Sequence, residues 1–257
     1  MSENSMLESR HRQIQEQFGQ RAPIYEERAA WIPDEGILST FVRLCQVPRE
    51  STLLDVCCGT GIVGGAFRGR VDRLVGLDLT REMLERAKER LDEVHQGSAD
   101  ALPFADNTFD CAIIRQALHF VESPAGVVAQ MARVVRPGGQ VIVGHRVPYG
   151  PLDAEWWARI NRAKQPLIKN LLLAADLERF VKEAGLVDLE LKELFVEESI
   201  RRWVDSPEAQ GGGNDVFRFY QETPPEIREI RHIVVGEDEV RDTWRWVVIS
   251  GRKPGAL

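Results

Sequence analysis

The sequence predicts an α/β fold built on a doubly wound, mostly parallel sheet. Two observations carry this prediction. Short apolar runs alternate with helix-length amphipathic segments through most of the chain, which is the pattern of parallel strands joined by crossover helices. A glycine-rich stretch, CCGTGIVG, follows the first apolar run, where such sheets turn from a strand into a helix. Ligands of these sheets bind beyond the carboxyl ends of the strands, so we expect the site at that edge.

The expected strands are short, apolar and bounded by turn residues, which is typical of strands buried on both faces. They are residues 51–57, 73–79, a third region just before Gly97, and residues 109–114, 140–147, 187–195 and 243–251. The expected helices have apolar residues at helical spacing. They are residues 14–30, 36–45, 80–94, 123–135, 152–173 and 176–184. Pro23 should kink the first helix, and Ser123 followed by Pro124 should begin the fourth.

The composition is that of a folded globular protein. Hydrophobic residues make up 43% of the 257 residues and charged residues 28%, which excludes global disorder. Acidic residues outnumber basic residues by 40 to 33, and this net charge of −7 disfavours nucleic-acid binding. The four cysteines lack metal-ligand spacing, so we expect reduced thiols, no metal site and a cytoplasmic location. No apolar run is long enough for a membrane span, and the N-terminus lacks the apolar core of a secretory signal.

The glycine-rich loop fits a nucleotide-binding pattern. Gly59, Gly61 and Gly64 match G-x-G-x-x-G, and Asp78 ends the next strand, 78 − 61 = 17 residues after the middle glycine. A carboxylate in that position can accept hydrogen bonds from both hydroxyls of a ribose. This spacing also fits a dinucleotide such as NAD. Asp55 favours another ligand, because a carboxylate before the glycines would repel a pyrophosphate but could hold a positively charged amine.

Five segments of the chain together carry a family resemblance. They are LLDVCCGTG, VGLDLTREML, GSADALPF, FDCAII and RVVRPGGQV. In these segments, and over residues 18–147 generally, the chain resembles class I S-adenosylmethionine-dependent methyltransferases of the methyltransferase type 11, or ubiquinone/menaquinone methyltransferase-like, family. The resemblance implies a Rossmann-like sheet of seven strands whose last strand, residues 243–251, is antiparallel, with residues 187–195 as the sixth. One departure is Cys57, which stands where the family has its first loop glycine.

The resemblance implies S-adenosyl-L-methionine as the cofactor and gives several residues a role in binding it. Gly59 and Gly61 let the loop pass beneath the cofactor, and Asp55 lies near its amino group. Asp78 binds the ribose diol, and Asp100 reads the adenine edge together with the backbone of Ala101. The expected cofactor-binding set is Tyr25, Asp55, Gly59, Thr60, Gly61, Asp78, Leu79, Met83, Asp100, Ala101 and Arg115.

Each of these residues also has a purely structural interpretation. Asp55 could cap the loop, Asp78 could cap the next helix, and Asp100 could be a turn aspartate. Met83 and Tyr25 could be ordinary helix-packing residues. Arg115, after the fourth strand, could be a solvated surface residue.

Two histidines are the candidate general bases. A base is needed only if the methyl acceptor must lose a proton on attack; otherwise alignment is enough. His119 follows the fourth strand and His145 lies near the end of the fifth, both at the carboxyl edge. If His119 is the base, turnover should rise with pH through a pKa near about 6.5. The alternative is that both histidines belong to the pocket wall.

The expected domain organisation is one core with additions at its edge. It consists of N-terminal helices closing over the cofactor at 1–45, the cofactor-binding core at 46–150, a helical insertion at 151–175, the rest of the core sheet at 176–196 and 243–257, and a lid insertion at 197–242. Aromatic residues in the insertions, such as Trp156, Trp157 and Trp203, favour an apolar or aromatic acceptor, and Arg201 and Arg202 could meet an acidic group. We expect residues 14–30 and 197–242 to be mobile without ligand.

We therefore expect methyl transfer from S-adenosyl-L-methionine to a small-molecule acceptor. Three alternatives stay open: methylation of tRNA or protein, a non-catalytic S-adenosylmethionine-binding protein, and an NAD-dependent oxidoreductase. The acidic balance argues against tRNA. The sequence does not choose among O, N, C and S as the methylated atom, or fix an oligomeric state.

Overall fold

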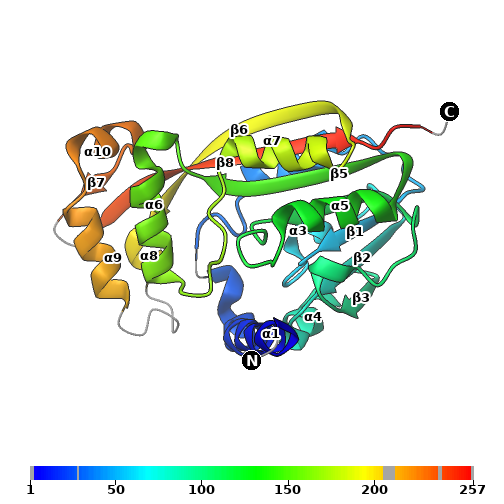
Figure 1. Cartoon of the computed structure of the whole chain (residues 1–257), viewed down its shortest axis with the longest axis horizontal. Helices are drawn as coiled ribbons and strands as arrows, with labels where there is room; N and C mark the ends of the chain where they lie inside the picture. Colours follow the sequence, from blue (N-terminus) through cyan, green and yellow to red (C-terminus); the bar gives the residue numbers. More distant parts are fainter. Residues whose placement is uncertain (1–2, 28, 205–211, 237–238, 256–257) are drawn as a thin grey trace.

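The fold is a single mixed sheet with helices on both faces (Figure 1). The structure is a computed structural model that describes residues 3–27, 29–204, 212–236 and 239–255. Within these ranges the strands are β1 (Thr52–Val56), β2 (Arg73–Asp78), β3 (Glu93–Gln96), β4 (Phe109–Arg115), β5 (Val135–Val147), β6 (Val187–Ser199), β7 (Val234–Val235) and β8 (Val240–Arg252).

The strand order is that of a doubly wound sheet with one reversed strand. It runs β3-β2-β1-β4-β5-β8-β6, with β7 paired to the outer part of β8. The pairs among β1 to β5 are parallel, with Leu54 of β1 opposite Val75 of β2 and Ala112 of β4. Strand β8 is antiparallel to both β5 and β6. The predicted antiparallel last strand is confirmed, and the two-residue β7 is an addition that the sequence did not indicate.

The sheet separates two apolar cores because successive residues of a strand point to opposite faces. Leu53 belongs to the core beneath α2 (Glu35–Leu44), α3 (Ile62–Gly65) and α4 (Arg81–Ala87). Leu54 belongs to the core beneath α5 (Pro124–Val134) and α7 (Ala174–Glu183), which contact each other. Helix α5 begins as predicted, because Ser123 Oγ accepts a hydrogen bond from Gly126 N at 3.0 Å and Pro124 takes the first helical position.

The predicted helix at 80–94 is too long. Helix α4 ends at Ala87, and the chain turns so that Asp92 pairs with β2: Asp92 N donates to Leu74 O at 2.9 Å, and Asp92 Oδ2 accepts from Leu74 N at 2.8 Å. Residues 93–96 then form β3 along the free edge of β2. The charged run between these elements has good helix propensity, but the unpaired edge of β2 determines the outcome.

Two other helices also differ in extent from the predictions. The first helix begins earlier, as α1 (Glu3–Arg21), and changes to the 3-10 helix η1 (Ala22–Glu27) where Pro23 predicted a kink. The helix predicted for 152–173 is α6 (Pro151–Lys164), which ends at Lys164 because Pro166 disfavours helical backbone at the residue before it. The following loop folds back onto β4's carboxyl end, where Lys169 N donates to His119 O at 2.9 Å.

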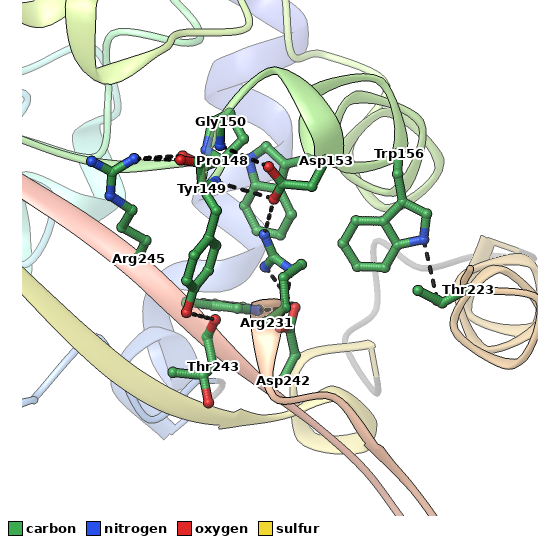
Figure 2. Close-up of polar contacts among 12 residues, drawn as sticks. Pro148, Tyr149, Gly150, Asp153, Trp156, Thr223, Arg231, Asp242, Thr243 and Arg245 are labelled. Carbon is green, nitrogen blue, oxygen red and sulfur yellow. Dashed lines mark hydrogen bonds and ion pairs between the residues drawn. The ribbon is translucent and has the colours of Figure 1, made fainter. Parts of the chain in front are cut away.

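The segment predicted as a lid packs on α6 at one end of the sheet. It contains α8 (Ile200–Val204), α9 (Gly212–Gln221) and α10 (Pro225–Arg231), which Figure 1 shows beside α6. Arg231, on α10, links that helix to α6 and β8 in a buried network (Figure 2). Its Nη1 lies 2.7 Å from Asp153 Oδ2 on α6, and its Nη2 lies 2.7 Å from Asp242 Oδ2 on β8. Tyr220 on α9 donates to the same Asp242 oxygen at 2.7 Å.

No helix within the described ranges has the length and apolar character needed to cross a membrane.

Candidate active site

The glycine loop turns sharply at the carboxyl end of β1. Its backbone has positive φ at Cys57 (55°), Gly59 (54°) and Gly61 (76°), the left-handed region that glycine adopts most easily. A Cβ added at Gly61 would lie 3.2 Å from the Ala87 Cα of α4, whereas one added at Gly59 would meet nothing within 4 Å. Gly61 therefore lets the loop pack against α4, and Gly59 leaves open space in front of the loop for a ligand.

A cavity of about 740 Å³ lies in front of this loop, and we call it the Asp78 cavity. It collects seven of the eleven cofactor residues expected from the sequence, namely Tyr25, Gly59, Asp78, Leu79, Met83, Asp100 and Arg115. It also collects Cys57, the departure in the glycine loop, and residues that the sequence analysis missed, among them Phe18, Ser98, Gln116 and Phe120. Gln116 had one available signal, because it directly follows β4 at the carboxyl edge.

Asp78 is held at the end of β2 by backbone donors. Its Oδ2 accepts from Gly59 N and its Oδ1 from Thr80 N, both at 2.9 Å. Burial raises the pKa of Asp78, and these backbone hydrogen bonds oppose that rise. A carboxylate has about four acceptor positions, so each oxygen can still accept from a ligand hydroxyl. Asp78 thus has a fixed orientation and free acceptor capacity facing the cavity.

Asp100, another residue of the cavity lining, is held in a similar way. Its Oδ1 accepts from Glu122 N at 3.1 Å and from Ser123 N at 3.2 Å, at the start of α5. The helix N-terminus favours a carboxylate there. Asp100 therefore ties the loop after β3 to α5 and also lines the Asp78 cavity.

Arg115 and Tyr25 close the side of the cavity next to the N-terminal segment. Arg115 Nη1 donates to Ile32 O at 2.9 Å, and its guanidinium lies 5.3 Å from the ring centre of Trp31. Burial lowers the pKa of Arg115 and raises the pKa of the Tyr25 hydroxyl. Arg115 thus fastens the segment after η1 to the end of β4.

Four residues of the expected cofactor set lie outside the cavity lining. Asp55 is buried behind the loop, where its Oδ2 accepts from Gly64 N at 2.8 Å, and burial raises its pKa to about 7. This hydrogen bond agrees with the loop-capping interpretation of Asp55, and a contact between Asp55 and the cofactor amino group stays a prediction. Thr60 and Gly61 are buried against the neighbouring elements. Ala101 N donates to Ser98 O at 3.3 Å, so the backbone N–H expected to read adenine is used within the turn.

A second cavity, of about 720 Å³, adjoins the first, and we call it the Arg146 cavity. Phe18, Tyr25, Gln116 and Phe120 line both cavities. The remaining wall of the Arg146 cavity combines basic, polar and aromatic side chains, among them Arg21, His119, Arg146, Asn161, Lys164 and Trp203. Gln116 connects the two walls, because its Oε1 accepts from Arg146 N at 2.7 Å.

The two candidate catalytic histidines form one buried pair. Nδ1 of His119 lies 3.0 Å from Nε2 of His145, and Nδ1 of His145 lies 2.7 Å from the carbonyl oxygen of Arg146. Because a carbonyl only accepts, Nδ1 of His145 carries its proton, and Nδ1 of His119 donates to His145. Neutral His119 therefore has its lone pair on Nε2. His119 lines the Arg146 cavity, whereas His145 lies behind it.

The histidine pKa values differ from the sequence-based expectation. Burial is the main cause that lowers the pKa of His119 well below its ordinary value, and His145 lowers it further. Burial lowers the pKa of His145 to about 4. The expected pKa near 6.5 for His119 is therefore wrong, because desolvation disfavours the imidazolium form.

The Asp78 cavity fits S-adenosyl-L-methionine, the cofactor that the resemblance implies. The anchored carboxylate of Asp78 suits a ribose diol, and the open space at Gly59 permits close approach of a ligand to the loop. Leu79 and Met83 give an apolar surface for a flat ring. Within the described residues, no three His, Cys, Asp or Glu side chains are grouped as metal ligands would be.

Comparison with known sequences gives a family for the central part of the chain. Residues 54–143 match the family model described as a methyltransferase domain. Demethylmenaquinone methyltransferase of Bacillus licheniformis is 41% identical over 109 residues, which are 39% of this chain and 47% of that protein. The uncharacterized methyltransferase YcgJ of Bacillus subtilis is 29% identical over 157 residues, 58% of this chain and 62% of that protein. The chain thus spans less than two thirds of either curated relative.

Comparison with solved structures extends the likeness to the whole fold. The structure of YcgJ superposes with a TM-score of 0.79 at 20% identity, over 87% of this chain and 100% of that chain. Phosphoethanolamine N-methyltransferase 2 of Haemonchus contortus, solved with S-adenosyl-L-methionine, gives a TM-score of 0.60 at 16% identity, over 86% of this chain and 53% of that chain. Residues 54–143 thus match a methyltransferase domain, and the fold of the chain is similar to those of these two solved structures, one of which contains S-adenosyl-L-methionine.

Proposed function

We propose that this protein transfers a methyl group from S-adenosyl-L-methionine, bound in the Asp78 cavity, to a small molecule bound in the Arg146 cavity. The observation that carries the proposal is the junction of the two cavities, where the same four side chains line both. Two ligands held on either side of this junction would meet there. Such alignment of two reactants is the main contribution that a protein makes to a transfer of this kind.

The bound cofactor supplies a methyl group on a positively charged sulfur, which is already activated for transfer. The protein's own residues orient the partners and exclude water. Phe18 and Phe120, packed edge to face at 5.2 Å, cover the junction with apolar surface. Tyr25 lines the same junction, and burial raises the pKa of its hydroxyl, so it stays protonated at neutral pH. An apolar junction favours transfer to the acceptor over loss of the methyl group to water.

His119 is the residue that we propose as the proton acceptor when the methyl acceptor must lose a proton. Its Nε2 lone pair has no hydrogen-bond partner among the described residues, and its ring lines the Arg146 cavity. His145 and the Arg146 carbonyl fix this tautomer through two hydrogen bonds. In this proposal His145 is a positioning residue that acts through His119.

Aromatic side chains support an apolar or aromatic acceptor. Phe18, Trp31, Phe120 and Trp203 all line the Arg146 cavity, and flat rings pack well against such walls. The relative from Bacillus licheniformis is named for a demethylmenaquinone substrate, which agrees with this class. The net charge of −7 supports a small molecule over tRNA. The four cysteines are free thiols, which supports a cytoplasmic location.

The proposal is tested by incubating the protein with methyl-labelled S-adenosyl-L-methionine and a cellular small-molecule extract. Mass spectrometry should show a labelled small molecule together with an equal amount of S-adenosylhomocysteine. Label found only in protein or RNA would support a macromolecular acceptor instead. Binding of the cofactor without any turnover would support the non-catalytic alternative.

A further inference from the structure

Arg146 is a buried cation that pairs with no carboxylate of the described residues. The residue is 7% exposed, and Nη2 donates to Asn161 Oδ1 at 2.8 Å. Nε and Nη1 have no hydrogen-bond partner within the described part of the chain. The guanidinium packs over three tryptophan rings, at 3.8 Å from the centre of Trp244, 4.6 Å from Trp157 and 5.1 Å from Trp203.

The carboxylates whose charge reaches Arg146 are already bound to other groups. Asp242 accepts from Arg231, Tyr220 and the indole of Trp244, and Glu198 accepts from the backbone N–H groups of Ala30 and Trp31. A buried charge without a close counter-ion is strongly unfavourable. The tryptophan faces compensate for only part of that cost, since a desolvated cation–π contact contributes about 2 kcal/mol. Burial accordingly lowers the pKa of Arg146 to about 9.

The unpaired charge lies in the wall of the Arg146 cavity, whose lining is basic. Arg21 and Lys164 also line it, and no Asp or Glu is found among its described lining residues. This composition contrasts with the net charge of −7 for the whole chain. It also contrasts with the adjoining cavity, which contains Asp78 and Asp100. A positively charged acceptor would be repelled here, and the two tryptophans that line the cavity already face cations, Arg146 over Trp203 and Arg115 over Trp31.

We propose that the Arg146 cavity binds an acceptor with a carboxylate group on a flat apolar or aromatic body, and that Arg146 supplies the counter-charge. This inference rests on the proposed function, in which the same cavity holds the methyl acceptor. The carboxylate completes the charge balance that the protein leaves open, while the aromatic walls hold the body of the molecule. Arg146 is then the residue that determines specificity for acidic over neutral acceptors.

The direct test compares two probes of nearly equal shape, 1-naphthoate and 1-naphthamide, by calorimetry with the protein saturated with S-adenosylhomocysteine. We expect naphthoate to bind at least about tenfold more tightly, because a hydrogen bond or close contact to a charged group contributes about 1.5–3 kcal/mol. Equal affinities, or no binding of naphthoate, would overturn the inference. Failure of S-adenosylhomocysteine itself to bind would instead overturn the proposed function.

Two variants assign the preference to Arg146. Arg146→Met should remove the tenfold preference for naphthoate and leave the affinity for S-adenosylhomocysteine within about twofold. Arg159→Met is the matched control, because Arg159 also stacks on an aromatic ring, at 3.8 Å from Phe219, but lies outside the cavity and is largely exposed. This control should keep the preference. A folded Arg146→Met protein that still prefers naphthoate would contradict the assignment.

Asn161→Asp provides a second variant that does not depend on the folding of Arg146→Met. It places a carboxylate beside Arg146 Nη2, where Asn161 Oδ1 now lies at 2.8 Å. The new carboxylate supplies the missing counter-charge from within, so naphthoate affinity should fall by about tenfold or more while naphthamide affinity changes little. Unchanged naphthoate binding by Asn161→Asp would show that Arg146 does not select the anion.

Discussion

At the scale of single residues, Asp78 shows how a backbone turn prepares a side chain for a ligand. Gly59 N and Thr80 N fix its two oxygens at 2.9 Å each and leave acceptor capacity on both. Asp55, two residues before the loop, was expected to lie near the amino group of the cofactor. It instead accepts from Gly64 N inside the loop and has no place in the cavity lining. Asp55 and Asp78 both lie at the ends of strands, and the path of the loop determines which of them faces the cavity.

Asp78→Asn should weaken binding of S-adenosylhomocysteine by about ten- to a hundredfold, because it removes a charged acceptor worth about 1.5–3 kcal/mol. Calorimetry measures this directly. Asp92→Asn is a suitable control, since Asp92 also accepts from a backbone N–H, Leu74 N at 2.8 Å, but lines neither cavity. An Asp78→Asn protein with wild-type affinity would remove Asp78 from the site.

His119→Ala should lower turnover by about 10²–10⁴-fold while cofactor affinity changes little, if the acceptor loses its proton to His119. The pH dependence follows from the direction of the pKa shift. The base-competent form is the neutral ring, and a pKa lowered well below 6.5 means that this form already dominates at pH 6.5. Turnover should therefore show no rise through pH 6.5, and loss should appear only at more acidic pH. A clear inflection near 6.5 that disappears in His119→Ala would contradict the buried, neutral histidine.

At the scale of elements, the two segments expected to be mobile are attached to the core very differently. Helix α1 has one buried apolar residue, Ile14, among its described side chains, and it is held mainly by polar contacts, such as Gln15 Nε2 to Leu79 O at 3.0 Å. Helix α10 carries Arg231, whose fully buried guanidinium binds two carboxylates (Figure 2). Few apolar contacts mean low local stability.

Hydrogen exchange should therefore divide the predicted mobile segments. Amides of α1 should exchange rapidly in the free protein and become protected when S-adenosylhomocysteine binds, because α1 residues such as Ile14 and Phe18 line the Asp78 cavity. Amides of α10 should be protected in both states. Equal protection of α1 with and without ligand would contradict a closing role for this helix, and rapid exchange in α10 would contradict the anchoring role of Arg231.

Arg231→Met should lower the free energy of unfolding by about 3–5 kcal/mol, because Asp153 and Asp242 would remain buried without their partner. Arg241→Met is the control: its pair with Glu197, at 3.3 Å, is exposed, so the loss should be below about 1 kcal/mol. Denaturant unfolding measures both. Similar small losses for the two variants would show that the Arg231 network does not anchor α10.

At the scale of the whole molecule, local patterns predicted most strands of the sheet, and the family resemblance implied the antiparallel last strand. Apolar runs such as residues 109–114 and the capped start of α5 at Ser123 depend on neighbours in sequence, and the structure has them where they were expected. The extent of strand β3 could not be predicted, because its formation depends on the free edge of β2 and not on its own charged sequence. Local propensity decides an element only where no tertiary partner competes.

The candidate site was likewise predictable from the sequence only where it depends on local pattern. Seven expected cofactor residues come together because the carboxyl ends of neighbouring parallel strands place them at one edge. The environment of Arg146 could not be predicted, because its tryptophan partners come from α6, α8 and β8, at positions 157, 203 and 244. The low histidine pKa values likewise depend on burial that the sequence alone does not show.

The central claim is that the cavity beside Gly59, Asp78 and Asp100 is an S-adenosylmethionine site joined to a separate acceptor cavity. Calorimetric titration of the wild-type protein with S-adenosylhomocysteine, and in parallel with NAD, tests the first and necessary part of it. The account predicts saturable binding of one S-adenosylhomocysteine per chain and no measurable binding of NAD. Binding of NAD, or failure of S-adenosylhomocysteine to bind to the folded protein, would contradict it.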